Sequence, residues 1–189
     1  MPPKVKITKE DIIQMALSLV REKGATVLNA RGIASALGCS TQPVFSNFAT
    51  MEELQAAVIA AAYDHYLDFL KAEAESGAYP PYKAFGCGYV RFAKEERELF
   101  RLLFMRDRGG EDLRPTPDFE ASVDMIMAAN GISREAASML HLEMWACTHG
   151  IATMIATSFL DLEWELISRM LSDAYLGLRA RHVTGGETV

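Results

Sequence analysis

Four polar side chains near the N-terminus have the types and spacing needed to form hydrogen bonds with a partner outside the protein. They are Thr41, Gln42, Ser46 and Asn47. On a short helix they would share the outer face, while Val44 and Phe48, four residues apart, would face inward. Such hydroxyl and amide groups can contact base edges or phosphates, and Gln or Asn can pair bidentately with adenine. The pattern therefore favours contact with double-stranded DNA.

A second group of side chains, further along the chain, could line a cavity for a small apolar or aromatic molecule. Aromatic and Met side chains form adaptable apolar walls, and His or Tyr can orient a ligand. The candidates are Phe85, Tyr89, Phe104, Met125, His141, Met144, Trp145 and His149. Stripes of this kind belong to a hydrophobic core more often than to a pocket, so packing in the core is the alternative for each residue. For Trp145 and His149, four residues apart on one helix face, packing is the first interpretation.

The sequence contains no recognisable catalytic or metal-binding pattern. It has no Gly-x-Ser-x-Gly motif, no phosphate-binding glycine loop and no His-Glu-x-x-His motif. Its histidines include no pair at i, i+4 spacing, although His141 and His149 share a helix face two turns apart. Cys39, Cys87 and Cys147 have neither zinc-site nor disulfide spacing, and a redox role for one of them remains an alternative. We expect a protein without enzyme activity, metal or cofactor.

Composition indicates a globular chain. Half of the 189 residues are hydrophobic and 23% are charged, so the chain can bury a core. No apolar run reaches the ~18 residues of a membrane span, and no leader-like segment opens the chain. We therefore expect a cytoplasmic protein without a membrane partner.

Charge is distributed unevenly. The net charge is −6, but residues 1–50 carry +3 and the rest of the chain carries −9. A basic segment attracts phosphate, and an acidic remainder maintains solubility. Ordinary charge fluctuation is the alternative explanation.

The polar group lies in a stretch, residues 30–48, that predicts two short helices around a tight turn. Ile33, Ala34 and Leu37 share one face of the first helix. Gly38 ends that helix, because Gly adopts positive φ without steric cost. We expect Ser40 to cap the second helix and Pro43 to lie third in its first turn. The predicted structure is a helix-turn-helix with an outward polar helix, as used to recognise DNA.

The motif Arg31-Gly-Ile-Ala-x-x-Leu-Gly-x-Ser-x-x-x-x-Phe-x-x-Phe48, followed by Glu53-Leu54, resembles the head of tetracycline-repressor (TetR) family regulators. A predicted helix over 8–23 precedes it, and a long helix follows from residue 51. The resemblance covers about the first third of the chain. Further on, Trp145-x-x-x-His-Gly150 resembles an element found in a subset of the family's C-terminal domains.

This resemblance implies that Arg31 and the start of the second short helix hold the DNA backbone. The implied DNA-binding residues are Arg31, Ser40, Thr41, Gln42, Pro43, Phe45, Ser46 and Asn47. Phe45 and Met51 stand where the family usually has Tyr and often has Lys. Phosphate contact would then depend more on Arg31, Lys9 or the helix N-termini.

The rest of the chain reads as helices. They are expected over 51–74, 82–94, 95–104, 118–130, 133–158 and 164–178, with a loop at 109–117. His65 falls on the apolar stripe of the long helix, where a core histidine is the first interpretation and a ligand-sensing one the second. The last two helices have a surplus apolar face, which predicts a partner surface. The predicted dimer-interface residues are Met154, Ile167, Met170, Leu171, Ala174 and Leu178.

These observations predict an all-α protein. Residues 1–50 would form an N-terminal three-helix bundle with the helix-turn-helix, and 51–189 a helical effector-binding and dimerisation domain. The expected function is a sequence-specific transcriptional regulator, by family habit a repressor. It would bind a near-palindromic operator as a homodimer, modulated by a small apolar or aromatic effector. The alternatives are a regulator without an effector, and a helical small-molecule-binding or catalytic protein with a non-functional head.

Overall fold

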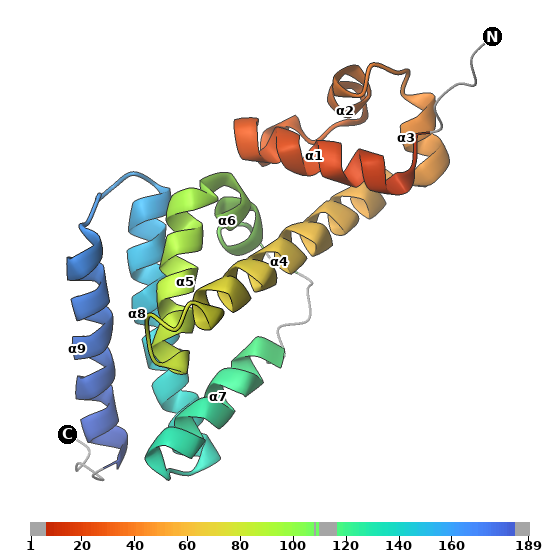
Figure 1. Ribbon diagram of the computed structural model, residues 1–189. Helices are drawn as coiled ribbons and strands as arrows, with labels where there is room; N and C mark the ends of the chain where they lie inside the picture. Colours follow the sequence, from red (N-terminus) through yellow and green to blue (C-terminus); the bar gives the residue numbers. More distant parts are fainter. Residues whose placement is uncertain (1–6, 108, 110–116, 184–189) are drawn as a thin grey trace. The chain divides into compact units, whose positions relative to one another are not determined.

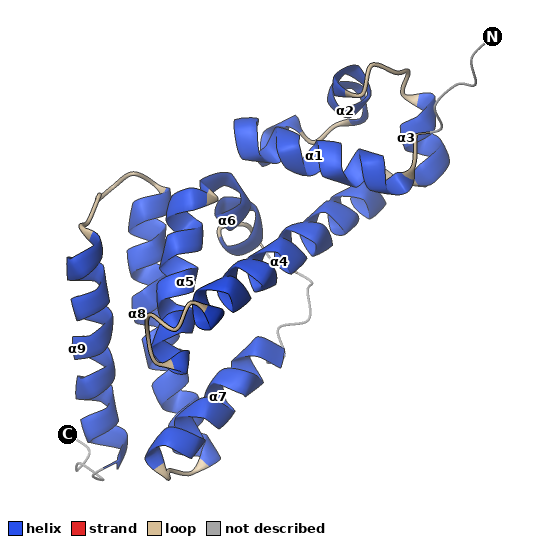
Figure 2. Ribbon diagram, in the orientation of Figure 1, coloured by secondary structure: helices blue, strands red, loops and turns tan. Residues whose placement is uncertain are grey.

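The computed structural model describes residues 7–107, 109 and 117–183, and these residues form helices and no strands (Figures 1 and 2). The predicted all-α class is confirmed. The order is α1 (Lys9–Lys23), the 3-10 helix η1 (Ala25–Val27), α2 (Ala30–Ala36), α3 (Gln42–Asn47), α4 (Met51–Glu75), α5 (Pro81–Glu95), α6 (Arg97–Phe104), α7 (Pro117–Asn130), α8 (Arg134–Ala156) and α9 (Trp164–Val183). None of the described helices combines the length and hydrophobicity that a membrane crossing requires. The predicted loop at 109–117 lies largely outside the described residues.

The described residues form two compact units. Unit 1 extends to Asp68 and also contains Glu96–Arg106; unit 2 contains Phe69–Glu95 and the described residues from Asp107 onward. Helix α4 therefore contributes to both units, and α6 belongs to unit 1 with α1. These units do not coincide with the segments 1–50 and 51–189, whose functional division stays a prediction.

Unit 1 begins with a capping box at the start of α1. The Thr8 hydroxyl accepts the N–H of Asp11 at 3.1 Å, and the Asp11 carboxylate accepts the N–H of Thr8 at 2.8 Å. The Thr8 hydroxyl also donates to that carboxylate at 2.7 Å, and the two hydrogen bonds from the N–H and the hydroxyl of Thr8 lower the pKa of Asp11. The apolar face of α1 is buried through Ile12, Ala16 and Val20, which packs the helix into the unit 1 core.

An ion pair joins α1 to the start of α6 inside unit 1. The Arg21 guanidinium donates two hydrogen bonds to the Glu96 carboxylate, at 2.9 and 2.7 Å. His65 Nε2 lies 2.7 Å from Arg21 Nη2 and 3.3 Å from Glu96 Oε1. The side chain of His65 is 37% exposed, so the core position predicted for it is wrong. Its place beside a charged pair explains why it stays at the surface.

In unit 2, helices α5, α8 and α9 lie side by side and α7 packs against α8 (Figure 1). One core cluster is formed by Val123, Ile126, Ala137, Leu140 and Met144. At Gly88 of α5, a Cβ atom would lie only 2.9 Å from Leu70 Cδ2 of α4, so a residue without a side chain is needed there. This contact brings α5 close to the C-terminal part of α4.

Candidate functional site

The helix-turn-helix of unit 1 is built from local signals. The Asn29 side chain caps α2 by accepting the N–H of Gly32 at 2.8 Å. At the other end, the N–H of Cys39 bonds the carbonyl of Ala34 at 2.9 Å, and Gly38 adopts φ +65°. This is a Schellman turn, for which positive φ at Gly38 is required. The predicted turn is confirmed.

Helix α3 starts one residue later than predicted. Its N-cap is Thr41 rather than Ser40, and no side-chain hydrogen bond caps it. The carbonyl of Thr41 accepts the N–H groups of Val44 and Phe45 at 3.1 and 3.2 Å, so the hydrogen bonds of the helix begin at Thr41. Thr41 itself has helical φ and ψ. Pro43 is therefore the second residue of α3, not the third, and its missing N–H costs no helical hydrogen bond.

The predicted recognition face is only partly exposed. Ser40, Gln42 and Ser46 are exposed, and Phe45 is 54% exposed, while Thr41, Pro43 and Asn47 are half-buried. The Ser46 hydroxyl and the Asn47 amide nitrogen both donate to the Pro43 carbonyl, at 3.1 and 2.8 Å. Val44 and Phe48 are buried, as their spacing predicts. Gln42 and Phe45 therefore have the most freedom to contact an outside partner.

Of the two cations considered for phosphate contact, Arg31 is the available one. Arg31 is exposed in the first turn of α2 and forms no ion pair with any residue that the structure describes. Lys9 Nζ instead pairs with Glu53 at 3.1 Å and lies 4.7 Å from the centre of the Phe48 ring. The cation of Lys9 thus holds the start of α1 against the start of α4.

Two Tyr–His hydrogen bonds link α5 to α8 in unit 2. Tyr82 Oη lies 2.9 Å from His141 Nδ1, and Tyr89 Oη lies 2.8 Å from His149 Nδ1. Burial lowers the pKa of both histidines and raises the pKa of both tyrosines. The imidazoles are therefore neutral near pH 7, and each tyrosine hydroxyl can donate to a ring nitrogen.

Aromatic rings flank both histidines. The Phe119 ring meets His141 edge-on at 4.7 Å, and the Trp145 ring stacks on His149 at 5.0 Å with an interplanar angle of 10°. Trp145 is 45% exposed, so this stack reaches the surface. The charge of Asp118 acts to raise the pKa of His141, against the larger effect of burial. This arrangement offers apolar ring faces beside polar atoms that are already hydrogen-bonded.

The other predicted ligand residues fall elsewhere. Phe104 belongs to unit 1, where its ring packs against Tyr66 at 5.1 Å and Phe100 at 5.2 Å. Met144 is a member of the unit 2 core cluster. Phe85 and Met125 are half-buried, on α5 and α7. Met144 and Phe104 therefore take part in packing, the structural alternative already open to them.

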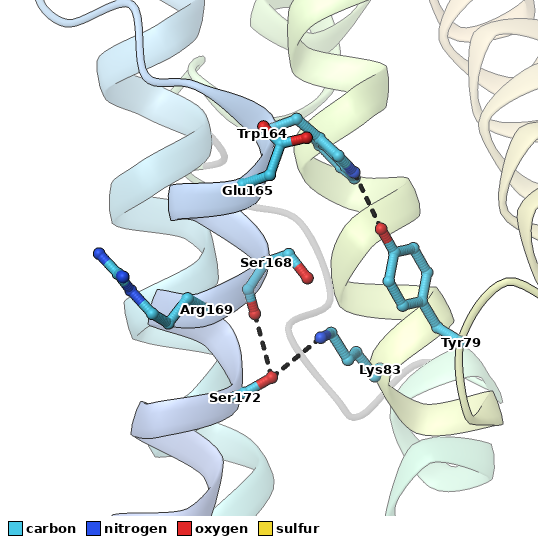
Figure 3. Close-up of a pocket in the computed structure, with 7 residues that line it drawn as sticks. All are labelled: Tyr79, Lys83, Trp164, Glu165, Ser168, Arg169 and Ser172. Atoms are coloured by element: carbon cyan, nitrogen blue, oxygen red, sulfur yellow. Dashed lines mark hydrogen bonds between the residues drawn. The ribbon is translucent and has the colours of Figure 1, made fainter.

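A hollow of about 350 Å³ in unit 2 contains none of the predicted ligand residues (Figure 3). It is lined by Tyr79, Lys83, Trp164, Glu165, Ser168, Arg169 and Ser172. Five of these residues are on α9, at spacings that put mainly polar side chains along one side of the helix. That polar stripe was the signal in the sequence, but its position opposite Tyr79 and Lys83 depends on how α9 packs against α5.

The predicted dimer residues mostly face the interior of their own unit. Ile167 and Leu171 are 0% and 3% exposed, and Ala174 and Leu178 pack against the unit 2 core cluster. Met154 and Met170 are half-buried. Ile167 and Leu171 are thus core residues, and Ala174 and Leu178 are partly buried, because the apolar stripe of α9 packs against its own unit. The exposed apolar side chains of α8 are instead Met139, Leu142 and Trp145.

Two comparisons with known proteins bear on these sites. Residues 82–173 match the family model described as tetracyclin repressor-like, C-terminal domain. An uncharacterized HTH-type transcriptional regulator of Mycobacterium tuberculosis is 22% identical over 160 residues, covering 82% of this chain and 73% of that protein. The first match covers most of unit 2.

Proposed function

Because the chain belongs to the tetracycline-repressor (TetR) family of DNA-binding transcriptional regulators, we propose that it recognises a specific operator and releases it when a small molecule binds unit 2. The operator would be near-palindromic, and the protein would act as a repressor in the cytoplasm. The repressor role follows the habit of the family. No catalytic role is proposed.

The observation that carries this proposal is the exposed surface of α3, together with the exposed Arg31 of α2. The helix is held by the Gly38 turn, with Gln42 and Phe45 directed outward. A glutamine amide can pair bidentately with adenine, and an apolar ring can contact the methyl group of thymine. The exposed Arg31 can neutralise a phosphate next to the groove. One short helix thus offers both kinds of contact that specific recognition needs.

The exposed apolar side chains of α8 support assembly into a homodimer. Met139, Leu142 and Trp145 are 50%, 50% and 45% exposed and follow one another at three-residue spacing. A second copy of the same face would cover them by two-fold symmetry. Two recognition helices related in this way contact half-sites about 34 Å apart on DNA.

The Tyr–His pairs support an effector site between α5 and α8. A small apolar or aromatic molecule would contact the Phe119 ring and compete for the hydrogen bond between Tyr82 and His141. It would change DNA affinity only by the difference between its affinities for the two arrangements of the dimer. A regulator without an effector would show no such difference.

The test is selection of bound fragments from genomic DNA by the purified protein at two salt concentrations. Enrichment of one short, near-palindromic sequence at both concentrations is the expected result. Enrichment that is independent of sequence and vanishes with added salt would mean phosphate attraction alone, and would contradict the proposal. Once an operator sequence is known, a library of small aromatic compounds is screened for release of a labelled DNA fragment that carries it.

A further inference from the structure

The hollow between the start of α5 and the first half of α9 has the features of a separate ligand site (Figure 3). It shares no lining residue with the Tyr–His pairs. Its volume of about 350 Å³ lies at the lower end of the range found for small-molecule sites, about 300–1,000 Å³. A small ligand therefore fits it better than a nucleotide or a peptide.

A lysine without a carboxylate partner supplies the charge of the hollow. Lys83 is half-buried, its Nζ donates to the Ser172 hydroxyl at 2.9 Å, and it forms no ion pair within the described part of the chain. The Ser172 hydroxyl in turn donates a hydrogen bond to the Ser168 carbonyl at 3.0 Å. Because an ammonium group has three donors, Lys83 keeps protons for an anion.

An aromatic wall lies beside this cation. The Trp164 indole N–H donates to Tyr79 Oη at 2.9 Å, so the polar atoms of the two rings satisfy each other. One face of each ring carries a cation, because the Arg91 guanidinium lies 4.6 Å from the centre of the Trp164 ring and Lys83 Nζ lies 4.9 Å from the centre of the Tyr79 ring. The two rings line the hollow with the rest of their apolar surface. A ligand that matches both features has a flat apolar body and an anionic group.

The acidic residue in the lining limits the ligand's charge. Glu165 contributes a carboxylate, and the guanidinium of Arg169 points away from Lys83 in Figure 3. The lining thus carries two cations, Lys83 and Arg169, and one carboxylate, a sum of +1, which suits a monoanion better than a doubly charged phosphate ester. From these features we propose that the hollow binds a small aromatic monocarboxylate. This site goes beyond the proposed function, and its test uses no DNA.

The experiment uses the full chain carrying Trp145→Phe, which leaves Trp164 as its one tryptophan. Sodium benzoate is titrated while Trp164 emission is recorded, and calorimetry on the unmodified protein gives an independent Kd. Benzyl alcohol and benzylamine are the neutral and cationic counterparts. We expect saturable binding of benzoate, weaker binding of benzyl alcohol and the weakest binding of benzylamine.

Two substitutions in the hollow and one matched control locate the site. Lys83→Met should raise the Kd for benzoate about tenfold, because a charge-assisted hydrogen bond is lost. Glu165→Gln should lower the Kd roughly threefold, because a like charge is removed. Lys71→Met, which removes a surface lysine of α4, should leave the Kd unchanged. Glu165 is exposed, so Glu165→Gln gives an answer even where Lys83→Met fails to fold.

Three results would overturn the proposal. Absence of saturable benzoate binding rules out the site, and a Kd unaffected by both Lys83→Met and Glu165→Gln assigns the ligand to another part of the protein. Equal affinities for benzoate and benzyl alcohol, or tighter binding of benzylamine, contradict the anionic class. None of these results bears on operator recognition, so the two proposals fail independently.

Discussion

The two compact units differ in what their candidate functional side chains already contact. In unit 1, Gln42 and Arg31 are exposed and keep their hydrogen-bonding groups available. In unit 2, Tyr82 and Tyr89 are bonded to histidines across two helices. Unit 1 therefore offers free polar groups to an outside partner, whereas a ligand of unit 2 must compete with internal bonds or pack against rings. This difference predicts that substitutions act by different routes in the two units.

The largest expected effect on stability comes from creating a cavity in the core of unit 1. Phe48 is 2% exposed, and Phe48→Ala should lower the free energy of unfolding by about 3–5 kcal/mol, as measured by urea denaturation. DNA binding should be lost, while NMR signals of the His141 and His149 rings stay in place. Simultaneous loss of those signals would mean that the units unfold together and would weaken the comparison.

The next effect concerns the exposed face of α8. Leu142→Glu should raise the dissociation constant of the homodimer by about tenfold or more, because a charge would enter an apolar contact. Leu176→Glu on α9 is the matched control, since Leu176 is 58% exposed and lies outside that face. Sedimentation equilibrium measures both. Equal weakening of the dimer by the two changes would contradict an interface confined to the exposed face of α8.

Removing the exposed cation of α2 should weaken binding to every DNA sequence. Arg31→Ala is expected to cost about tenfold in affinity, because one charge-assisted phosphate contact is lost. Lys23→Ala removes an equally exposed cation at the end of α1 and serves as control. Fluorescence anisotropy with specific and random duplexes distinguishes the cases. A sequence-dependent loss for Arg31→Ala would assign it to base contact instead.

Within α3, two amide side chains should behave differently. Gln42→Ala should relax the preferred base at one operator position by about 1 kcal/mol or more. Asn47→Ala should mainly reduce stability, by about 1 kcal/mol, because its amide nitrogen donates to the Pro43 carbonyl. Repeated selection from random DNA, combined with urea denaturation, measures both quantities. A changed base preference for Asn47→Ala alone would reverse the assignment.

The smallest effect is a pH dependence of the free energy of unfolding, which comes from different groups in the two units. Burial lowers the pKa of His141 and His149 from 6.5, so just below pH 6.5 the unfolded chain binds more protons. The free energy of unfolding should fall as the pH drops through 6.5, and less steeply in His149→Gln. The pKa of Asp11 in unit 1 is lowered from 3.8, so the stability that Asp11 contributes is lost only as the pH falls below 3.8. An unchanged slope in His149→Gln would contradict this account.

The parts of the structure that depend on neighbouring residues could be predicted from the sequence. The Thr8 cap, the Gly38 turn and the buried positions of Val44 and Phe48 are set by spacing within a few residues. The hollow beside Lys83 could not be predicted, because it depends on the register between α5 and α9. Ile167, predicted for a dimer interface, is buried within its own unit for a related reason. Apolar periodicity identifies a face that is covered, but not whether the cover is the same chain or another copy.

The two hydrogen bonds to the Pro43 carbonyl also affect the thermodynamics of association. A helix of six residues is too short to be stable alone. The Ser46 and Asn47 side chains, together with buried Val44, stabilise the helical conformation of α3 before any partner binds. Binding then costs little conformational entropy in this segment, because the helix is preorganised. The heat-capacity change of complex formation should accordingly match the surface buried, without an added contribution from folding of α3.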